Sequence, residues 1–502
     1  MSQPREGPPT RRLPGAFFFS GNTSASLWSS NLSRSLFLRF LIVTSFLTVA
    51  SFASAQEPSR QTLDHQFHQA ASDYEAGNYQ QAASRLEPLL PYATKSFEVH
   101  ELLGLVYAGL RDEIRAEKHL KLAVQIAPNS VAGRTNFGAF LMQSGKRELA
   151  AEQFKRALQL EPGNYDANHD LAELLIQAGQ IGEAQPYLLK AQIANPESYE
   201  NGYDLVLAEY TLGKLKAARQ IAQKLLEQHN TAELHNLLGK IEEKDGQFVD
   251  AAKEFEVAAH LDPTEDNLFD WGSEMLLHRT YDPAIEIFKN ATERYPKSPR
   301  LFIGLGLSNY FRGQYDEAVK ALLQATDLNP SDPRAYVFLS KAYDSSPTQA
   351  DDVIERFRHF AELKPNDGKA QYYYAISLWK GKRTSGTGVD LGKVEELLKK
   401  AIQLDDTLAD AHVELGDLYS GEHKYEQAIS QYTRALQLDP DISDAHYRLG
   451  TNYVHVGKKD EAQKEFAIYQ KLRAQHLENL AKERAEVQQF IFSETNAGAV
   501  KP

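Results

Sequence analysis

A spacing of thirty-four residues recurs along most of this chain and restricts its fold more than any other feature. The stretch HVELGDLYSGEHKYEQAISQYTRALQLDP, from His412 to Pro440, returns thirty-four residues later as HYRLGTNYVHVGKKDEAQKEFAIYQKL. In a frame that begins at Leu63, the eighth, twentieth and twenty-seventh positions carry small residues in most units, such as Gly138, Ala150 and Ala157. Twelve units fit between Leu63 and His476 if the frame shortens by one residue twice. The repeat therefore predicts an array of similar structural units.

Each unit has the pattern of two helices joined by a turn. Apolar residues three to four apart mark one buried face on each helix, as Phe137 and Leu141 do in the first helix and Phe154 in the second. Between the helices stands a glycine in most units, such as Gly145, which can adopt the left-handed conformation that ends a helix. A proline near position 32 ends the second helix, and the prolines in this place are Pro128, Pro162, Pro196, Pro263, Pro296, Pro330, Pro365 and Pro440.

The pattern resembles the tetratricopeptide repeat family, most completely in Val131–Asn164 and Ala409–Ile442. The resemblance covers about four fifths of the chain and implies an all-α fold. The fold expected is a right-handed superhelical solenoid of about twelve antiparallel helix pairs over residues 63–476, degenerate near 333–408. We expect residues 477–502 to form a long capping helix, with Leu477, Leu480, Val487 and Ile491 along one face, and a disordered tail.

Local departures from the pattern give further expectations. Pro88 falls within the second helix of the first unit, which indicates an atypical end cap. The tenth unit contains an insertion, GKRTSGTGVDLGK (Gly381–Lys393), that we predict to be a surface loop.

The N-terminal segment differs in charge from the rest of the chain. The formal net charge is -13, yet the first 55 residues carry five Arg, one Glu and neither Lys nor Asp, so the remainder carries -17. We predict a disordered, basic, Ser- and Pro-rich extension over residues 1–35 and a signal peptide over 36–55, cleaved after Ala55. An uncleaved membrane anchor through residues 36–56 is the alternative. The protein is therefore expected to be exported, either periplasmic or secreted, or held at the membrane by this segment.

The family resemblance implies that five positions of each first helix, the second, fifth, ninth, twelfth and thirteenth, face a concave groove that binds a peptide segment. In the middle of the chain these positions are aromatic, aliphatic or basic, which suits an acidic or amphipathic partner. The alternative for any one of them is packing against the next repeat or against the chain's own N-terminal arm. The candidate groove residues are Tyr203, Tyr210, Phe269, Leu276, Ile303, Tyr310, Phe311, Tyr372, Trp379, Arg300, Lys341, Lys369 and Lys380.

Carboxylates occupy the same positions nearer the two ends of the array. Glu98, Asp166, Glu173, Glu200, Glu233 and Asp266 give the N-terminal half an acidic inner edge, and Asp410, Asp417 and Asp444 do so near the other end. Ordinary solvated charge is the alternative explanation. A negative chain is also a poor ligand for a polyanion, so we expect no nucleic acid partner.

No motif for catalysis, cofactor binding or metal binding stands out. The chain has no cysteine, and it has neither a nucleophile elbow nor a phosphate-binding loop. His100, His235, His412 and His446 all occupy the fourth position of a unit, where we expect them to pack between helices rather than hold a metal.

The sequence thus predicts a noncatalytic protein-interaction scaffold of the cell envelope that binds a peptide segment or a protein in its groove. The alternative is a structural subunit of an export or polysaccharide-secretion complex. A hydrolytic or carbohydrate-active site on the scaffold is a third reading, and it has no motif in its favour.

Overall fold

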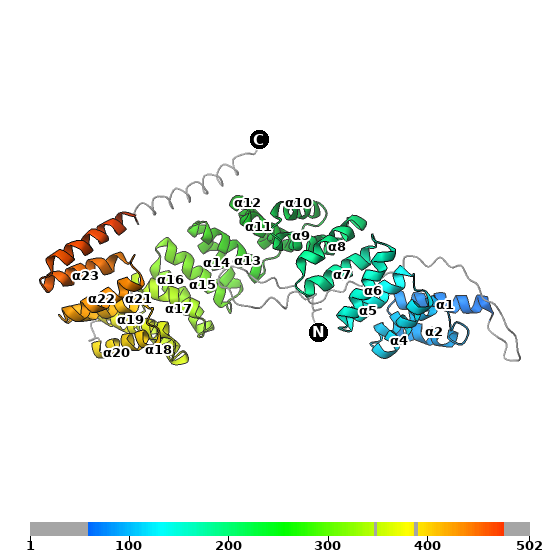
Figure 1. Cartoon of the computed structure of the whole chain (residues 1–502), viewed down its shortest axis with the longest axis horizontal. Helices are drawn as coiled ribbons and strands as arrows, with labels where there is room; N and C mark the ends of the chain where they lie inside the picture. Colours follow the sequence, from blue (N-terminus) through cyan, green and yellow to red (C-terminus); the bar gives the residue numbers. More distant parts are fainter. Residues whose placement is uncertain (1–58, 346–348, 386–389, 476–502) are drawn as a thin grey trace, which may run out of the picture. The chain divides into compact units, whose positions relative to one another are not determined.

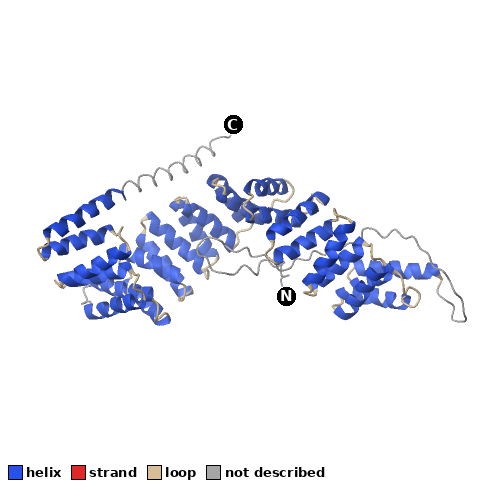
Figure 2. Ribbon diagram, in the orientation of Figure 1, coloured by secondary structure: helices blue, strands red, loops and turns tan. Residues whose placement is uncertain are grey.

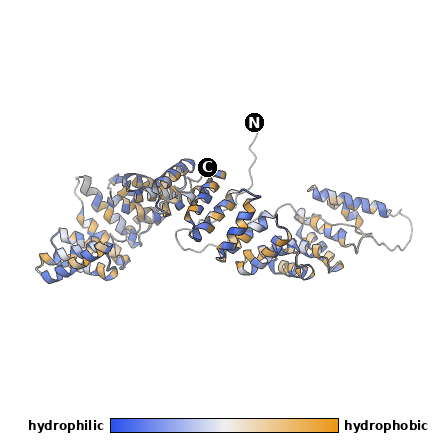
Figure 3. Cartoon of the chain, turned by 90° about the horizontal axis from the view of Figure 1, so that it is seen from above, coloured by the Kyte–Doolittle hydropathy of each residue, from blue (hydrophilic) through white to orange (hydrophobic). Residues whose placement is uncertain are grey.

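The computed structural model describes residues 59–345, 349–385 and 390–475, and within these ranges the chain forms helices and turns without a strand (Figures 1 and 2). The predicted N-terminal extension (1–35), the signal or anchor segment (36–55) and the capping extension (477–502) lie outside the described residues. None of the described helices is both long and apolar enough to cross a bilayer. Apolar and polar residues share every helix, as expected for helices that bury one side only (Figure 3).

The chain divides into two compact units, and the first ends at Asn230. Its described part consists of five helix pairs and one 3-10 turn. These are α1 (Arg60–Glu75) and α2 (Tyr79–Leu86) with η1 (Glu87–Leu89), α3 (Phe97–Gly109) and α4 (Glu113–Ile126), α5 (Val131–Gln143) and α6 (Arg147–Leu160), α7 (Tyr165–Gln177) and α8 (Ile181–Ala194), and α9 (Tyr199–Thr211) and α10 (Leu215–Leu226).

The second unit begins at Thr231, and its described part has seven helix pairs. These are α11 (Ala232–Lys244) and α12 (Phe248–Leu261), α13 (Glu265–Leu277) and α14 (Tyr281–Arg294), α15 (Pro299–Arg312) and α16 (Tyr315–Leu328), α17 (Pro333–Ser345) and α18 (Ala350–Leu363), α19 (Gly368–Ser385) and α20 (Leu391–Leu404), α21 (Ala409–Gly421) and α22 (Tyr425–Leu438), and α23 (Ser443–His455) with a last helix described over 459–475. The expected all-α solenoid of paired helices is confirmed.

The short side chains at the eighth and twentieth positions set the distance between the two helices of a pair. A Cβ atom on Gly138 of α5 would lie 2.5 Å from Cε1 of Phe154, which is fully buried on α6. Ala150 and Ala157 are also fully buried in this contact. The helices can approach this closely because no side chain separates them.

A left-handed residue at the fifteenth position ends most of the first helices. Gly145 has φ 73°, and glycines at the same place in six other units have φ between 74° and 85°. Arg111, Arg279 and His423 occupy this position with φ 59°, 59° and 61°, although they are not glycines. The turn is therefore imposed by the packing of the helices, and glycine makes it less costly.

Polar caps begin most first helices of the array. The side chains of Ser130, Asn164, Ser198, Thr231 and Thr264 each accept a hydrogen bond from the backbone N–H three residues later. Such caps satisfy an otherwise unpaired N–H and stabilise a helix start by about 1 kcal/mol each.

Two local expectations need correction. Pro88 does not lie inside the second helix of the first pair, because α2 ends at Leu86 and Pro88 belongs to the 3-10 turn η1. The insertion Gly381–Lys393 is not wholly a loop. Its first five residues extend α19 to Ser385, α20 begins at Leu391, and residues 386–389 lie outside the described part.

Candidate functional site

The first helices of successive pairs contact one another along much of each unit. In the second unit α11 contacts α13, α13 contacts α15, α15 contacts α17, and α17 contacts α19. The side chains at the second, fifth, ninth, twelfth and thirteenth positions therefore share a surface, which we call the first-helix face. The predicted groove residues belong to this face, but Tyr203 and Tyr210 lie in the first unit and the other eleven lie in the second.

Three of the predicted residues are mainly core residues. Tyr203, Ile303 and Trp379 are only 6%, 8% and 9% exposed. Trp379 packs in one cluster with Val394 and Leu398. Packing against neighbouring helices, the alternative stated for any one position, describes these three side chains.

An aromatic and aliphatic cluster remains accessible near the end of α15. Phe311 is 50% exposed, and Leu277, at the equivalent position of the preceding pair, is 41% exposed. The Phe311 ring stacks on Tyr281 at 6.0 Å between centroids and meets the half-buried Tyr310 edge-on at 5.3 Å. These contacts hold Phe311 in place while half of its surface faces solvent.

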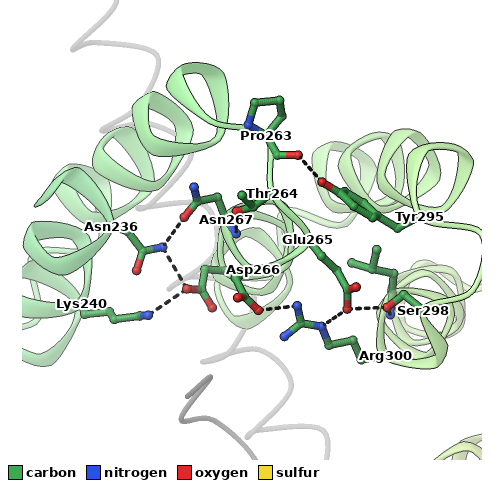
Figure 4. A network of polar contacts seen from close by, with 12 residues as sticks. Asn236, Lys240, Pro263, Thr264, Glu265, Asp266, Asn267, Tyr295, Ser298 and Arg300 are labelled. Carbon is green, nitrogen blue, oxygen red and sulfur yellow. Dashed lines mark hydrogen bonds and ion pairs between the residues drawn. The ribbon is translucent and has the colours of Figure 1, made fainter. Parts of the chain in front are cut away.

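Arg300 is already bound by carboxylates of the preceding first helix (Figure 4). Its Nε donates to Glu265 at 2.5 Å and its Nη2 donates to Asp266 at 2.5 Å, while its guanidinium lies 5.0 Å from the centre of the Phe269 ring. The Ser298 hydroxyl donates to the same Glu265 oxygen at 2.8 Å. Arg300 was predicted to attract an acidic partner, but two acids of its own chain neutralise it.

The same network continues to α11 through residues that the sequence analysis did not single out (Figure 4). The Asn236 amide donates to Asn267 at 3.2 Å and to Asp270 at 2.9 Å, and Lys240 pairs with Asp270 at 2.9 Å. Opposite charges at the same position of consecutive units, as at Asp266 and Arg300, were the signal in the sequence for such pairing. The network joins three successive first helices.

Lys380 is likewise paired within the chain. It contacts Asp344 of α17 and lies 3.7 Å from Glu414 of α21. Burial raises the pKa of Glu414, and the nearby Lys380 opposes that rise. Farther along, Arg448 pairs with Asp417, which also accepts a hydrogen bond from the Tyr432 hydroxyl at 2.5 Å. Burial raises the pKa of Asp417 in spite of these partners.

Lys341 and Lys369 are the two predicted cations that keep their charge available. Both are exposed, and neither forms an ion pair with any residue in the described part of the chain. The Lys341 ammonium lies 5.7 Å from the centre of the Phe338 ring, which orients it without neutralising it. Tyr372, three residues after Lys369, is half-buried, and burial raises the pKa of its hydroxyl well above the ordinary value.

The histidines at the fourth position connect the two helices of a pair through side-chain hydrogen bonds. In each case Nδ1 lies within hydrogen-bond distance of the side chain nineteen residues later, on the second helix of the pair. The pairs are His100 with His119 at 2.9 Å, His235 with Glu254 at 2.5 Å, His412 with Gln431 at 2.8 Å, and His446 with Glu465 at 2.5 Å. Nε2 of His446 also donates to the carbonyl of Pro440 at 2.9 Å. Over residues 59–345, 349–385 and 390–475, no three potential ligands come close enough to hold a metal ion.

The carbonyl contact of His446 recurs with other residue types. Arg134 donates to the carbonyl of Pro128 at 2.8 Å, Asn168 to that of Pro162 at 3.0 Å, and Tyr336 to that of Pro330 at 3.1 Å. In each case the fourth position of one unit satisfies the carbonyl six residues earlier, at the end of the preceding unit. A histidine here serves the same structural purpose as an asparagine or a tyrosine.

Comparison with family models supports the resemblance to tetratricopeptide repeats over several stretches of the chain. Residues 141–196 and 203–266 match two models that are each described as a tetratricopeptide repeat, and residues 309–344 and 423–457 match one described as a TPR repeat. No curated protein matches the chain.

The chain is similar to many solved structures, and the three named here are less than 20% identical to it. It is 18% identical to a chain of the Naa15/Naa10 complex bound to HypK-THB, covering 81% of this chain and 68% of that one with a TM-score of 0.36. It is 15% identical to yeast Tom70, covering 86% and 96% with a TM-score of 0.35. It is 19% identical to pilF of Pseudomonas aeruginosa, covering 41% and 94% with a TM-score of 0.37.

Proposed function

Because the chain is a tetratricopeptide repeat protein, and therefore a protein-interaction scaffold, we propose that the first-helix face of α13 to α19 binds an extended segment of a partner protein. The accessible side chains of this surface include Leu277, Phe311, Lys341 and Lys369, with Tyr310 and Tyr372 half-buried. We call this surface the aromatic face.

The observation that carries the proposal is the exposure of Phe311 and Leu277 at equivalent positions of adjacent pairs. A solvated helix would lose nothing if polar residues replaced them, yet both present large apolar side chains to solvent, and Phe311 packs against the rings of Tyr281 and Tyr310. Apolar anchors of this kind contribute most of the binding energy at protein interfaces.

The charges of the aromatic face specify the ligand further. Arg300 pairs with Glu265 and Asp266, and Lys380 pairs with Asp344 and Glu414. These two cations therefore join neighbouring helices and leave little charge to attract a ligand. Lys341 and Lys369 remain to pair with a carboxylate of the ligand. The fitting partner is a segment with apolar side chains for Phe311 and Leu277 and at least one acidic residue, which is the amphipathic character expected from the sequence.

The proposed binding involves no chemistry, because Arg300 and Lys380 are paired with carboxylates of the chain and the sequence shows no catalytic motif. We place the scaffold in the cell envelope, because an uncharged apolar run at Phe40–Gln56 follows Arg34 and Arg39 in the manner of an export signal. Mass analysis of the N-terminus of the purified native protein tests this location. A start at Gln56 supports it, and an intact N-terminus in a soluble cytosolic fraction contradicts it.

The test of the aromatic face is the double variant Leu277→Ala and Phe311→Ala in the full chain, used as immobilised bait against a membrane and periplasm extract. We expect the proteins captured by the parent chain to be lost, with affinity at least about tenfold weaker, because two anchors are removed. Phe248→Ala is the matched control. Phe248 is 40% exposed but begins the second helix α12 and packs on His278.

Equal capture by the double variant and by the parent chain would contradict the proposal. Far-UV circular dichroism must show the same helicity for all three proteins. Trp379 is unsuitable for the test because it is buried, so its removal would disturb the core.

A further inference from the structure

The first helices of the first unit carry a charge opposite to that of the aromatic face. Helices α3, α5, α7 and α9 contain eight carboxyl residues and a single arginine. Asp204 and Glu209 are buried, and the six others form what we call the acidic face: Glu98, Glu101, Asp166, Asp170, Glu173 and Glu200.

The arginine does not neutralise this surface. Arg134 is only 9% exposed and is directed to the second helix, where its Nη1 donates to Gln153 at 3.1 Å while Nε donates to the carbonyl of Pro128. No Lys or Arg of the described residues pairs with Asp166, Asp170 or Glu173. The acidic face therefore has an excess of negative charge without internal compensation.

The carboxyl groups of the acidic face lie close enough together to raise one another's pKa. Asp166, Asp170 and Glu173 are four and then three residues apart, so they lie along one side of α7 over about 10 Å. Burial raises the pKa of Asp170 well above its ordinary value, and Asp166 and Glu173 raise it further. On α3, burial and Glu98 raise the pKa of Glu101 to about 7, although the Asn136 amide donates to it at 3.0 Å.

The spacing suits an extended chain better than a metal ion. The six carboxyl groups are spread along α7 and over the neighbouring first helices, and the described residues contain no cluster of three that could coordinate a cation. Adjacent packed helices lie about 8–10 Å apart, and an extended polypeptide covers that distance in about three residues. Half-buried apolar side chains lie on three of the same helices: Leu105 and Leu207 at the ninth position of α3 and α9, and Met142 at the twelfth position of α5. They would contact the aliphatic parts of the side chains of such a polypeptide.

We propose that the acidic face binds an extended, Lys- and Arg-rich segment of a partner protein, with a cation at about every third residue. The proposal is independent of the aromatic face, which lies in the other unit and has the opposite charge. Complementarity of charge identifies the ligand, because an anionic lipid, nucleic acid or acidic peptide would be repelled.

The chain itself contains a competing occupant. Residues 1–58 carry five arginines and two carboxylates, Glu6 and Glu57, and they immediately precede α1 of the same unit. If this segment covers the acidic face, a separate basic partner is excluded, so the experiment has an arm for it.

The test uses the full chain and a fluorescent ten-residue peptide with lysine at every third position and serine elsewhere, titrated by anisotropy at about 50 mM salt. Asp166→Asn, Asp170→Asn and Glu173→Gln are combined in one variant. The control variant combines Glu148→Gln, Glu183→Gln and Glu197→Gln, which removes the same charge from exposed residues outside the first helices. We expect about tenfold weaker binding for the first variant and less than about twofold for the control.

Three results would overturn the proposal. One is the absence of binding to the parent chain. The second is an equal loss in both variants, which would mean that only the net charge matters. The third is binding that appears only after the five arginines at 5, 11, 12, 34 and 39 are changed to glutamine, which would assign the acidic face to the chain's own N-terminal segment.

Discussion

The close contact between Gly138 and Phe154 permits a quantitative prediction. A Cβ at position 138 would lie 2.5, 2.8 and 3.0 Å from three ring carbons of Phe154, whereas ordinary contacts are longer than 3.4 Å. Phe154 is fully buried, so it cannot swing into solvent. Gly138→Ala must therefore displace the ring or separate α5 from α6 by nearly 1 Å, and we expect a loss of about 2 kcal/mol in the free energy of unfolding.

A double-mutant cycle with Phe154→Leu separates this clash from other effects of the alanine. The next pair shows that an alanine and a leucine fit together, because Ala172 and Leu188 occupy the equivalent positions and both are fully buried. Phe154→Leu alone should cost about 1 kcal/mol. Gly138→Ala should cost at least about 1 kcal/mol less in that background than in the parent chain.

The assay is urea unfolding followed by circular dichroism at 222 nm, with the four proteins compared at a common slope. Gly163→Ala is the control, because a Cβ there would meet no atom within 4 Å. Additive effects, with the alanine equally costly beside leucine, would refute the steric explanation.

Three further predictions concern single residues. Arg111→Gly should raise the thermal midpoint, since Arg111 has φ 59° and glycine relieves about 1 kcal/mol of strain, whereas Gly145→Ala should lower it. His119 should make stability depend on pH. Burial and the adjacent His100 lower the pKa of His119 to about 4. The free energy of unfolding should therefore be highest above the unfolded-state pKa near 6.5 and decrease by up to about 3 kcal/mol as the pH falls toward 4. Urea titrations at several pH values measure this decrease, which should be smaller in His119→Gln. His446→Ala removes bonds to Pro440 and Glu465 and should cost about 2 kcal/mol, whereas the exposed His455→Ala should change the unfolding midpoint little.

Periodicity predicts the array of helix pairs because each repeat uses the same few contacts. A small residue opposite a ring, as at Gly138 and Phe154, and a proline that ends the second helix are local signals that any unit can show by itself. The left-handed turns at Arg111, Arg279 and His423 were not predictable from local propensity, since the packing of both helices forces them.

The site was less predictable than the fold. A position in the repeat indicates toward which surface a side chain points but not how deeply it is buried. Trp379 and Phe311 occupy adjoining positions, the twelfth and thirteenth, but are 9% and 50% exposed. A position also does not indicate whether the charge of a side chain is neutralised by the chain itself or left for a partner. Arg300 became part of the structure because Glu265 and Asp266 of another repeat lie within 2.5 Å, a contact between residues 34 and 35 apart in sequence.

The contact of the fourth position with the carbonyl six residues earlier has a consequence for how such a chain can evolve. Histidine, arginine, asparagine and tyrosine all make it, at His446, Arg134, Asn168 and Tyr336. In this contact the preceding repeat contributes only a main-chain oxygen, which every sequence supplies. The contact therefore survives the duplication, deletion or exchange of whole repeats without a matching side-chain change in the neighbouring repeat, unlike the ion pair of Arg300 with Asp266.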